Sequence, residues 1–138
     1  MTKPLKKVLY LEDDPHIAEI AMIALQDIGG FTVLHCATGA DAVAKVSEFS
    51  PDLLLFDVML PDMDGPQTLQ AIRQIEHCDQ LPVIFMTAKA QTHEQQQYID
   101  LGALTVILKP FDAMMLGEQL TSIWNSRASA QSRDRSAA

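Results

Sequence analysis

The sequence has few cysteines, few basic residues and no long apolar stretch, and each shortage argues against a class of protein. Cys36 and Cys78 are the only cysteines, with no CxxC spacing. We therefore expect two reduced structural thiols and no disulfide scaffold. No apolar run is long enough to cross a bilayer, and the run Val8–Leu11 is too short for a signal-peptide core. We expect a cytoplasmic protein that does not bind membranes.

Basic side chains are outnumbered by acidic ones. The chain holds 18 Asp and Glu against 10 Lys and Arg, a net charge of −8. Direct binding to nucleic acid needs clustered Lys and Arg to neutralise phosphates. The acidic body of the chain therefore predicts no direct nucleic-acid binding.

The chain is long enough for one domain with one core, since its 138 residues are 48% hydrophobic. After Asn125 only Ser, Ala, Arg, Gln and Asp occur. We predict a folded domain over residues 1–125 and a disordered tail, or the start of a linker, over residues 126–138. The composition does not decide between a stand-alone protein and a fragment of a larger regulator.

Short apolar runs alternate with segments of helical periodicity. Alternation of this kind predicts a doubly wound α/β fold, with a parallel sheet covered by helices on both faces. In such sheets, ligands bind beyond the carboxyl ends of the strands. Asp14 is expected to cap a helix, and Asp62 and Asp64 to form turns. The predicted strands are Val8–Leu11, Phe31–Ala37, Leu53–Phe56, Val83–Met86 and Thr105–Leu108; the predicted helices are Pro15–Ile28, Gly39–Phe49, Gln67–Glu76, Thr92–Leu101 and Asp112–Trp124.

Polar side chains follow four of the predicted strands. Glu12 and Asp13 end the first, Asp57 the third, Thr87 the fourth and Lys109 the fifth. Carboxylates gathered at one edge repel one another, and a divalent cation with oxygen ligands, such as Mg²⁺, relieves that repulsion. A carboxylate is also an established nucleophile toward phosphoryl groups. Taken alone, Thr87 could equally cap the next helix.

These stretches together resemble the receiver domains of bacterial response regulators, over about residues 5–125. The resemblance implies a flavodoxin-like sheet with strand order 2-1-3-4-5. The segments that carry it are VLYLEDD (8–14), LLFDVMLPDMDG (54–65), PVIFMTA (82–88) and LKPF (108–111).

The resemblance implies a metal site for Mg²⁺ or Mn²⁺. Asp13 and Asp57 match direct ligands, and Glu12 matches the acid that reaches the metal through water. Met59 matches the position whose backbone carbonyl binds the metal.

The resemblance also implies a phosphoryl site. Asp57 matches the phosphoacceptor, Thr87 the switching hydroxyl and Lys109 the lysine that pairs with the phosphate. The Lys109-Pro110 peptide bond matches one that is cis in the family.

A receiver domain of this type is a switch, not a turnover enzyme, with slow autodephosphorylation at most. The implied partners are a sensor histidine kinase or phosphotransfer protein and an unknown downstream protein. The implied output surface comprises the last two predicted helices and the strand between them. We expect a monomer or weak dimer. The sequence does not identify the kinase, the target or the phosphate lifetime.

One position departs from the family pattern. Receiver domains usually have Tyr or Phe three residues before the fifth-strand lysine, where this chain has Val106. Our hypothesis is that Thr87 and the loop after it carry the signal without an aromatic side chain. Two alternatives remain: a pseudo-receiver that binds partners without phosphorylation, and a Mg²⁺-dependent aspartyl-phosphate phosphohydrolase. Met59 argues against the latter, since such enzymes usually have an acid at that position.

Overall fold

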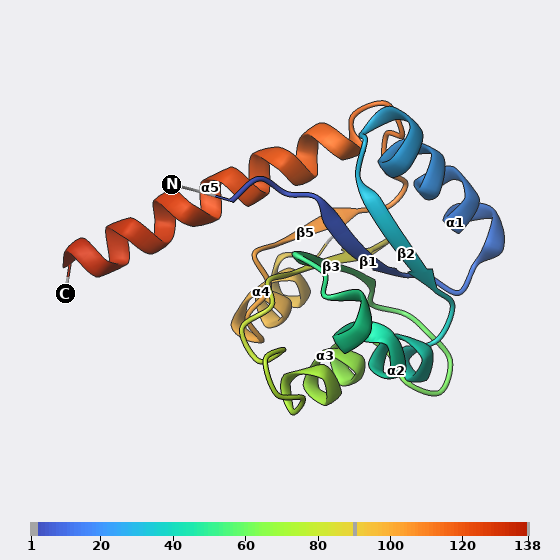
Figure 1. Ribbon diagram of the computed structural model, residues 1–138, viewed down its shortest axis with the longest axis horizontal. Coiled ribbons are helices and arrows are strands. Elements are labelled where there is room, and N and C mark those ends of the chain that lie inside the picture. The colour runs from blue at the N-terminus through green and yellow to red at the C-terminus, as the bar shows by residue number, and fades with distance from the viewer. Residues whose placement is uncertain (1–2, 90, 138) are drawn as a thin grey trace.

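The computed structural model describes residues 3–89 and 91–137, with side chains through Arg127. Its centre is a parallel sheet with strand order β2-β1-β3-β4-β5 (Figure 1). This arrangement confirms the doubly wound fold and the strand order expected from the sequence. The strands are β1 (Lys7–Leu11), β2 (Thr32–Cys36), β3 (Leu53–Asp57), β4 (Val83–Thr87) and β5 (Thr105–Leu108).

Helices cover both faces of the sheet and divide the core into two clusters (Figure 1). One cluster packs α1 (Pro15–Met22), the π-helix η1 (Ile23–Ile28) and α5 (Leu116–Ala137) on one face. The other packs α2 (Gly39–Phe49), α3 (Gly65–Arg73) and α4 (Thr92–Asp100) on the opposite face. All five residues of β3 and of β4 are buried, as expected for central strands covered on both sides.

Three helices begin with side-chain caps just after strands or turns. The Asp14 carboxylate accepts the backbone N–H groups of His16 and Ile17, as predicted for the start of α1. Thr38 caps α2, and Asp64 forms a capping box with Gln67 at the start of α3. These caps place the amino ends of the helices at the edge of the sheet where the strands end.

The segment predicted as one helix over Pro15–Ile28 changes to a π-helix at Ile23. Its N–H to O=C bonds span five residues, as between Gly29 and Ala24 at 3.0 Å. The Gln26 side chain accepts the Val33 N–H of β2 at 3.4 Å. We attribute the wider turn to this contact, because it lets a helix residue reach the edge of the sheet.

The last helix differs from its prediction at both ends. It begins at Leu116 instead of Asp112, because the Asp112 side chain accepts the Met114 N–H at 2.9 Å in a local turn. It runs to Ala137 and extends beyond the sheet in Figure 1. No Gly or Pro follows Gly117, so nothing local breaks the helix. The tail at 126–138 stays a prediction, since its side chains after Arg127 lie outside the described residues.

The amino-terminal segment is held by one buried carboxylate. The backbone N–H groups of Lys6 and Lys7 donate to Asp52 Oδ2 at 3.0 and 2.9 Å, and Lys3 Nζ lies 2.7 Å from Oδ1. Trp124 Nε1–H donates to the Lys3 carbonyl at 2.7 Å, which ties α5 to the same segment. Burial opposes ionisation of Asp52, but the Lys3 ammonium and the two N–H donors hold its pKa below the usual value.

We predict that Asp52→Asn lowers the free energy of unfolding by about 1–3 kcal/mol near neutral pH, because charged hydrogen bonds are lost. The stabilisation from a carboxyl with a lowered folded pKa is fully present above its unfolded pKa of about 3.9. It disappears as pH falls through the lower folded value, so the two proteins should converge in stability under acid conditions.

Urea unfolding of both proteins across this pH range measures the effect. Asp79→Asn is the matched control, because the Asp79 carboxylate is exposed and contacts only the neighbouring Gln80 amide in the described hydrogen bonds. A stability difference that is independent of pH would contradict the assignment.

Candidate functional site

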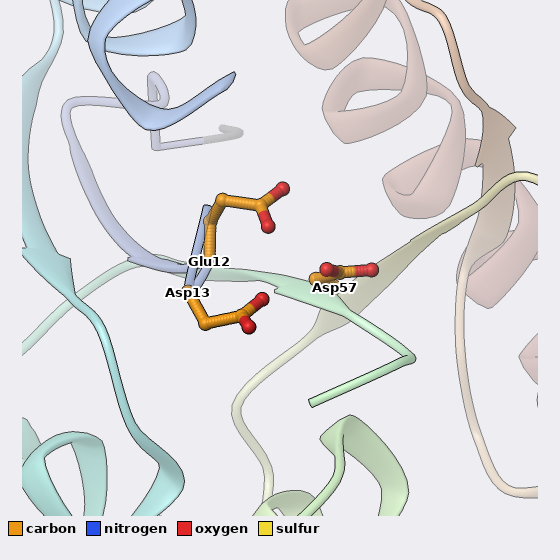
Figure 2. Close-up of side chains that lie close together, drawn as sticks. All are labelled: Glu12, Asp13 and Asp57. Atoms are coloured by element: carbon orange, nitrogen blue, oxygen red, sulfur yellow. The ribbon is translucent and has the colours of Figure 1, made fainter. Parts of the chain in front are cut away.

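The carboxyl ends of four parallel strands bring the predicted site residues to one edge of the sheet. Their interiors are apolar, so polar groups occur where β1, β3, β4 and β5 end. Glu12 follows β1, Asp57 and Thr87 close β3 and β4, and Lys109 follows β5. Figure 2 shows the carboxylates of Glu12 and Asp13 beside that of Asp57.

Three carboxylates form a compact cluster. One ligand oxygen from each of Glu12, Asp13 and Asp57 lies within 4.8 Å of the other two. Glu12 is 1% exposed and Asp57 4%, whereas Asp13 is exposed. The cluster is therefore buried on one side and open to solvent on the other, so an ion or small group can reach it.

Lys109 provides the positive charge at this cluster. Its Nζ lies 2.7 Å from Glu12 Oε1 and 3.1 Å from Asp57 Oδ2. Burial opposes the charged ammonium, but the contacts with Glu12 and Asp57 prevail and raise the pKa of Lys109. For Glu12, burial raises the pKa. The Lys109 ammonium opposes this shift, and the Asp57 carboxylate reinforces it. One ammonium thus faces three carboxylates, which leaves excess negative charge.

The oxygen-only donor set fits Mg²⁺ or Mn²⁺, which prefer carboxylate, carbonyl and water ligands. The excess negative charge supports this fit, because a divalent cation would neutralise the carboxylate charge that Lys109 does not balance. Glu12, Asp13 and Asp57 are the side chains that could hold it. For Met59 the recorded contact is its N–H, which donates to Asp57 Oδ1 at 3.4 Å. The role of its carbonyl as a ligand stays a prediction.

The Asp57 backbone is held tightly by the start of α3. The Gly65 N–H donates to the Val58 carbonyl at 3.1 Å. A Cβ atom on Gly65 would lie 2.4 Å from the Asp57 carbonyl oxygen, a distance that real atoms do not reach. The Asp-Gly-Pro sequence indicates a turn here, but nothing in it signals this contact, which depends on where β3 ends.

Thr87 is almost fully buried, at 1% exposure. Its Oγ1 accepts the Lys89 N–H at 3.1 Å, so its hydroxyl hydrogen remains available to another acceptor. The cap of α4 is Gln91. The alternative in which Thr87 caps this helix is therefore wrong.

Two further features complete the surroundings of the cluster. The Lys109-Pro110 peptide bond is cis, which confirms the expectation. His35 was not predicted to lie at the site, but its Nε2 lies 2.8 Å from the Glu12 backbone carbonyl oxygen. Only the register of β2 against β1 brings these residues together, so no local signal could have revealed the contact.

Comparison with known proteins gives consistent relatives. The family model described as the response regulator receiver domain matches residues 8–121. The chain is 34% identical over 106 residues to the DNA-binding dual master transcriptional regulator RpaA of Synechocystis, covering 77% of this chain and 44% of that protein. It is 32% identical over 120 residues to the probable C4-dicarboxylate response regulator DctR of Halalkalibacterium halodurans, covering 86% and 51%.

Solved structures agree with the sequence relatives. The chemotaxis protein CheY4 of Vibrio cholerae superposes with a TM-score of 0.79 at 28% identity, covering 86% of this chain and 98% of that one. The chain spans about half the length of the curated relatives that it matches. Within the described residues, no helix is both long and apolar enough to cross a membrane.

We predict opposite effects of two substitutions on Mg²⁺ binding. Asp13→Asn removes a charged ligand and should weaken binding by at least about tenfold. Lys109→Met removes the competing ammonium and should strengthen it by a factor on the order of ten. Isothermal titration calorimetry at low salt and pH 8 measures both.

The matched control is Asp41→Asn, which alters a half-exposed acid paired with Lys45 on α2. It should leave Mg²⁺ affinity unchanged. If Lys109→Met weakened binding, Lys109 would not compete with the cation, and if Asp13→Asn left the affinity unchanged, the cation would not lie at this cluster.

Proposed function

The chain belongs to the response regulator receiver domain family, and on that premise we propose that it accepts a phosphoryl group from a phospho-histidine kinase onto Asp57. The reaction is Mg²⁺-dependent and switches a partner-binding surface formed by α4, β5 and α5. Receiver domains are signalling switches of two-component systems and not turnover enzymes.

The observation that carries the proposal is the position of Lys109 between Glu12 and Asp57. A carboxylate oxygen of Asp57 attacks the phosphorus of the phosphohistidine. The P–N bond breaks, an O–P bond forms, and the imidazole leaves with the bonding electrons. Lys109, already 3.1 Å from Asp57 Oδ2, then pairs with phosphoryl oxygens as a fixed positive charge.

Glu12 and Asp13 prepare the same space for an anionic donor. A cation bound by these residues and Asp57 would reduce the repulsion between the donor phosphoryl and the carboxylates. Burial of Glu12 keeps its carboxylate fixed, and exposure of Asp13 leaves a path from solvent. Glu12 thus supplies a fixed, buried carboxylate, and Asp13 supplies one that the donor can reach from solvent.

Thr87 is proposed to sense the new group. Its hydroxyl hydrogen is free to donate to a phosphoryl oxygen, because the Lys89 N–H already occupies the oxygen as an acceptor. Movement of Thr87 would shift the loop that leads to α4. Val106, half-buried on β5, supplies no ring to report the change, so this loop carries the signal alone.

We place the protein in the cytoplasm, with a sensor histidine kinase or phosphotransfer protein as donor and an unidentified protein as target. RpaA is named as a DNA-binding regulator, but this chain matches only 44% of that protein. We propose that this region itself does not bind nucleic acid directly, since acidic side chains dominate it. A monomer or weak dimer remains our prediction.

Incubation with acetyl phosphate is predicted to add one phosphoryl group to the wild-type protein in the presence of Mg²⁺. The addition should be lost with EDTA and lost in Asp57→Asn, because both the cation and the nucleophile are required. Intact-protein mass spectrometry measures it.

Asp52→Asn is the matched control, since it neutralises another buried aspartate away from the cluster. It should still be phosphorylated under conditions in which it is folded. No addition to folded wild-type protein would instead support the pseudo-receiver. Rapid release of phosphate with multiple turnovers would support the phosphohydrolase.

The switch makes a separate prediction. Thr87→Ala should still take up phosphate, but the changes in amide chemical shifts of α4 and β5 on phosphorylation should shrink. Thr87→Ser, which keeps the hydroxyl, should restore them. ¹H–¹⁵N correlation spectra with and without acetyl phosphate compare the three proteins. Equal shift changes in Thr87→Ala and wild type would show that another residue transmits the signal.

A further inference from the structure

Tyr10 is a buried side chain that the proposed chemistry does not use. It lies on β1 with none of its surface exposed, in the core cluster that includes Ala18 and Ala21 of α1. Its hydroxyl has no hydrogen-bond partner within the described residues. A buried Tyr hydroxyl usually has a partner, because an unpaired polar group in the core costs free energy. The unpaired hydroxyl therefore needs a reason other than packing.

The sheet places Tyr10 beside the acid cluster. Alternate residues of a strand share a face, so Tyr10 and Glu12 lie on the same side of β1. The register pairs Tyr10 with Leu55, which puts Asp57 on that side too, two residues further along β3. Burial raises the pKa of Tyr10, and the charges of Glu12, Asp57 and Asp14 raise it further. These acids lie where β1 and β3 end, which indicates that the phenol leans toward that end.

The distance between Tyr10 and Glu12 suits a contact between their side chains. Residues two places apart on a strand are separated by about 6.6 Å along it. A tyrosine side chain spans a comparable length, and strand side chains lean along the strand direction. A rotation of the Glu12 side chain can therefore bring its carboxylate to the Tyr10 hydroxyl.

Each oxygen of the Glu12 carboxylate has one donor in the unphosphorylated protein. Lys109 Nζ lies 2.7 Å from Oε1, and the Asp14 N–H donates to Oε2 at 3.3 Å. After phosphoryl transfer, Lys109 is proposed to pair with phosphoryl oxygens, which draws the ammonium away from Oε1. Glu12 is 1% exposed, and an unpaired buried charge is costly. Oε1 then needs a second donor from within the core.

His35 on β2 keeps Tyr10 and Glu12 in place for such a contact. Its Nε2 lies 2.8 Å from the Glu12 backbone carbonyl oxygen. Its ring lies beside the Tyr10 ring, with the two centroids 5.6 Å apart, and the strand register pairs the two residues. One residue thus holds the backbone of Glu12 and one side of the phenol, so the exchange of donors requires side-chain movement only.

We propose that Tyr10 is a positioning residue for the phosphorylated state. When Lys109 moves to the phosphoryl group, the Tyr10 hydroxyl donates a hydrogen bond to Glu12 Oε1 in place of the ammonium. Glu12 then keeps two donors in both states, and its carboxylate stays fixed at the acid cluster. The inference deepens the proposed function and rests on it, because the exchange of donors follows phosphoryl transfer to Asp57.

A purely structural Tyr10 is the alternative. Phenylalanine would fill the same space without a polar atom, and replacing an unpaired buried hydroxyl by an apolar group is close to neutral or stabilising. Packing therefore accounts for the ring of Tyr10 but not for its hydroxyl. The two readings differ in what the hydroxyl does once Glu12 loses Lys109.

The first test observes the Tyr10 hydroxyl directly. The chain has two tyrosines, Tyr10 and Tyr98, so tyrosine labelled with ¹³C at Cζ gives two resonances, which Tyr98→Phe assigns. Lys109→Met, at pH 8 in EDTA, removes the ammonium from Glu12 without phosphorylation. In this variant the Tyr10 resonance should move downfield, as it does when a phenol donates to a carboxylate, and the Tyr98 resonance should stay.

The same labelled wild-type protein is then treated with acetyl phosphate and Mg²⁺. The Tyr10 resonance should move in the same direction as in Lys109→Met. Intact-protein mass spectrometry of the sample establishes that one phosphoryl group has been added.

A double-mutant cycle separates the exchange of donors from packing. Tyr10→Phe alone should change the equilibrium constant for unfolding by less than about twofold, because no hydrogen bond is lost. In the Lys109→Met background it should raise that constant by a factor on the order of ten, because a hydrogen bond to a charged group is lost. Tyr98→Phe is the matched control and should have the same effect in both backgrounds. Urea unfolding in EDTA at pH 8 measures all of these proteins.

Several outcomes would overturn the inference. One is an unmoved Tyr10 resonance in folded Lys109→Met protein, and another is an equal effect of Tyr10→Phe in both backgrounds. If Lys109→Met does not fold, the wild-type sample with acetyl phosphate decides. Addition of a phosphoryl group with an unmoved Tyr10 resonance would overturn the inference and leave the proposed function standing. No phosphoryl addition, with a moved resonance in Lys109→Met, would keep Tyr10 as a donor to Glu12 and contradict the proposed function.

Discussion

The contact of Lys109 with Glu12 and Asp57 is the constraint on which the site depends. It joins residues 97 positions apart in the chain, so it forms only after β1, β3 and β5 have taken their places in one sheet. Without the ammonium, two nearly buried carboxylates would repel each other with no positive side chain between them. The parallel topology makes the arrangement possible, because every strand ends at the same edge and four of the strands bring a polar residue there.

Much of this arrangement could be read from the sequence, because it is encoded locally. Apolar runs that end in Glu12, Asp57, Thr87 and Lys109 locate both the strands and the site. What could not be read depends on contacts between distant segments. The π-helix reflects a bond between Gln26 and β2, and the contact of His35 with Glu12 depends on strand register.

The end of the last helix was missed for another reason. The composition after Asn125 is polar, which predicts disorder, but the same residues contain nothing that stops a helix already begun. Composition therefore predicts disorder there and local propensity predicts a continued helix, and the sequence alone does not decide between these two predictions. The start of the helix, by contrast, depends on one turn at Asp112.

One strand serves both the proposed chemistry and the surface that phosphorylation is proposed to switch. Leu108 presents its backbone to the outside, and the next residue is Lys109 at the acid cluster. A change in the position of Lys109 therefore has to pass only one peptide unit to reach that surface.

Gly65 imposes a limit of a different kind. A methyl group there would overlap the carbonyl of Asp57, so the smallest possible replacement already forces the backbone at Asp57, the proposed nucleophile, or at position 65 to move. Only glycine therefore fits at position 65 while the Asp57 backbone keeps its place. The codon is thus constrained by the main chain of a residue eight places earlier, although glycine contributes no reactive atom of its own.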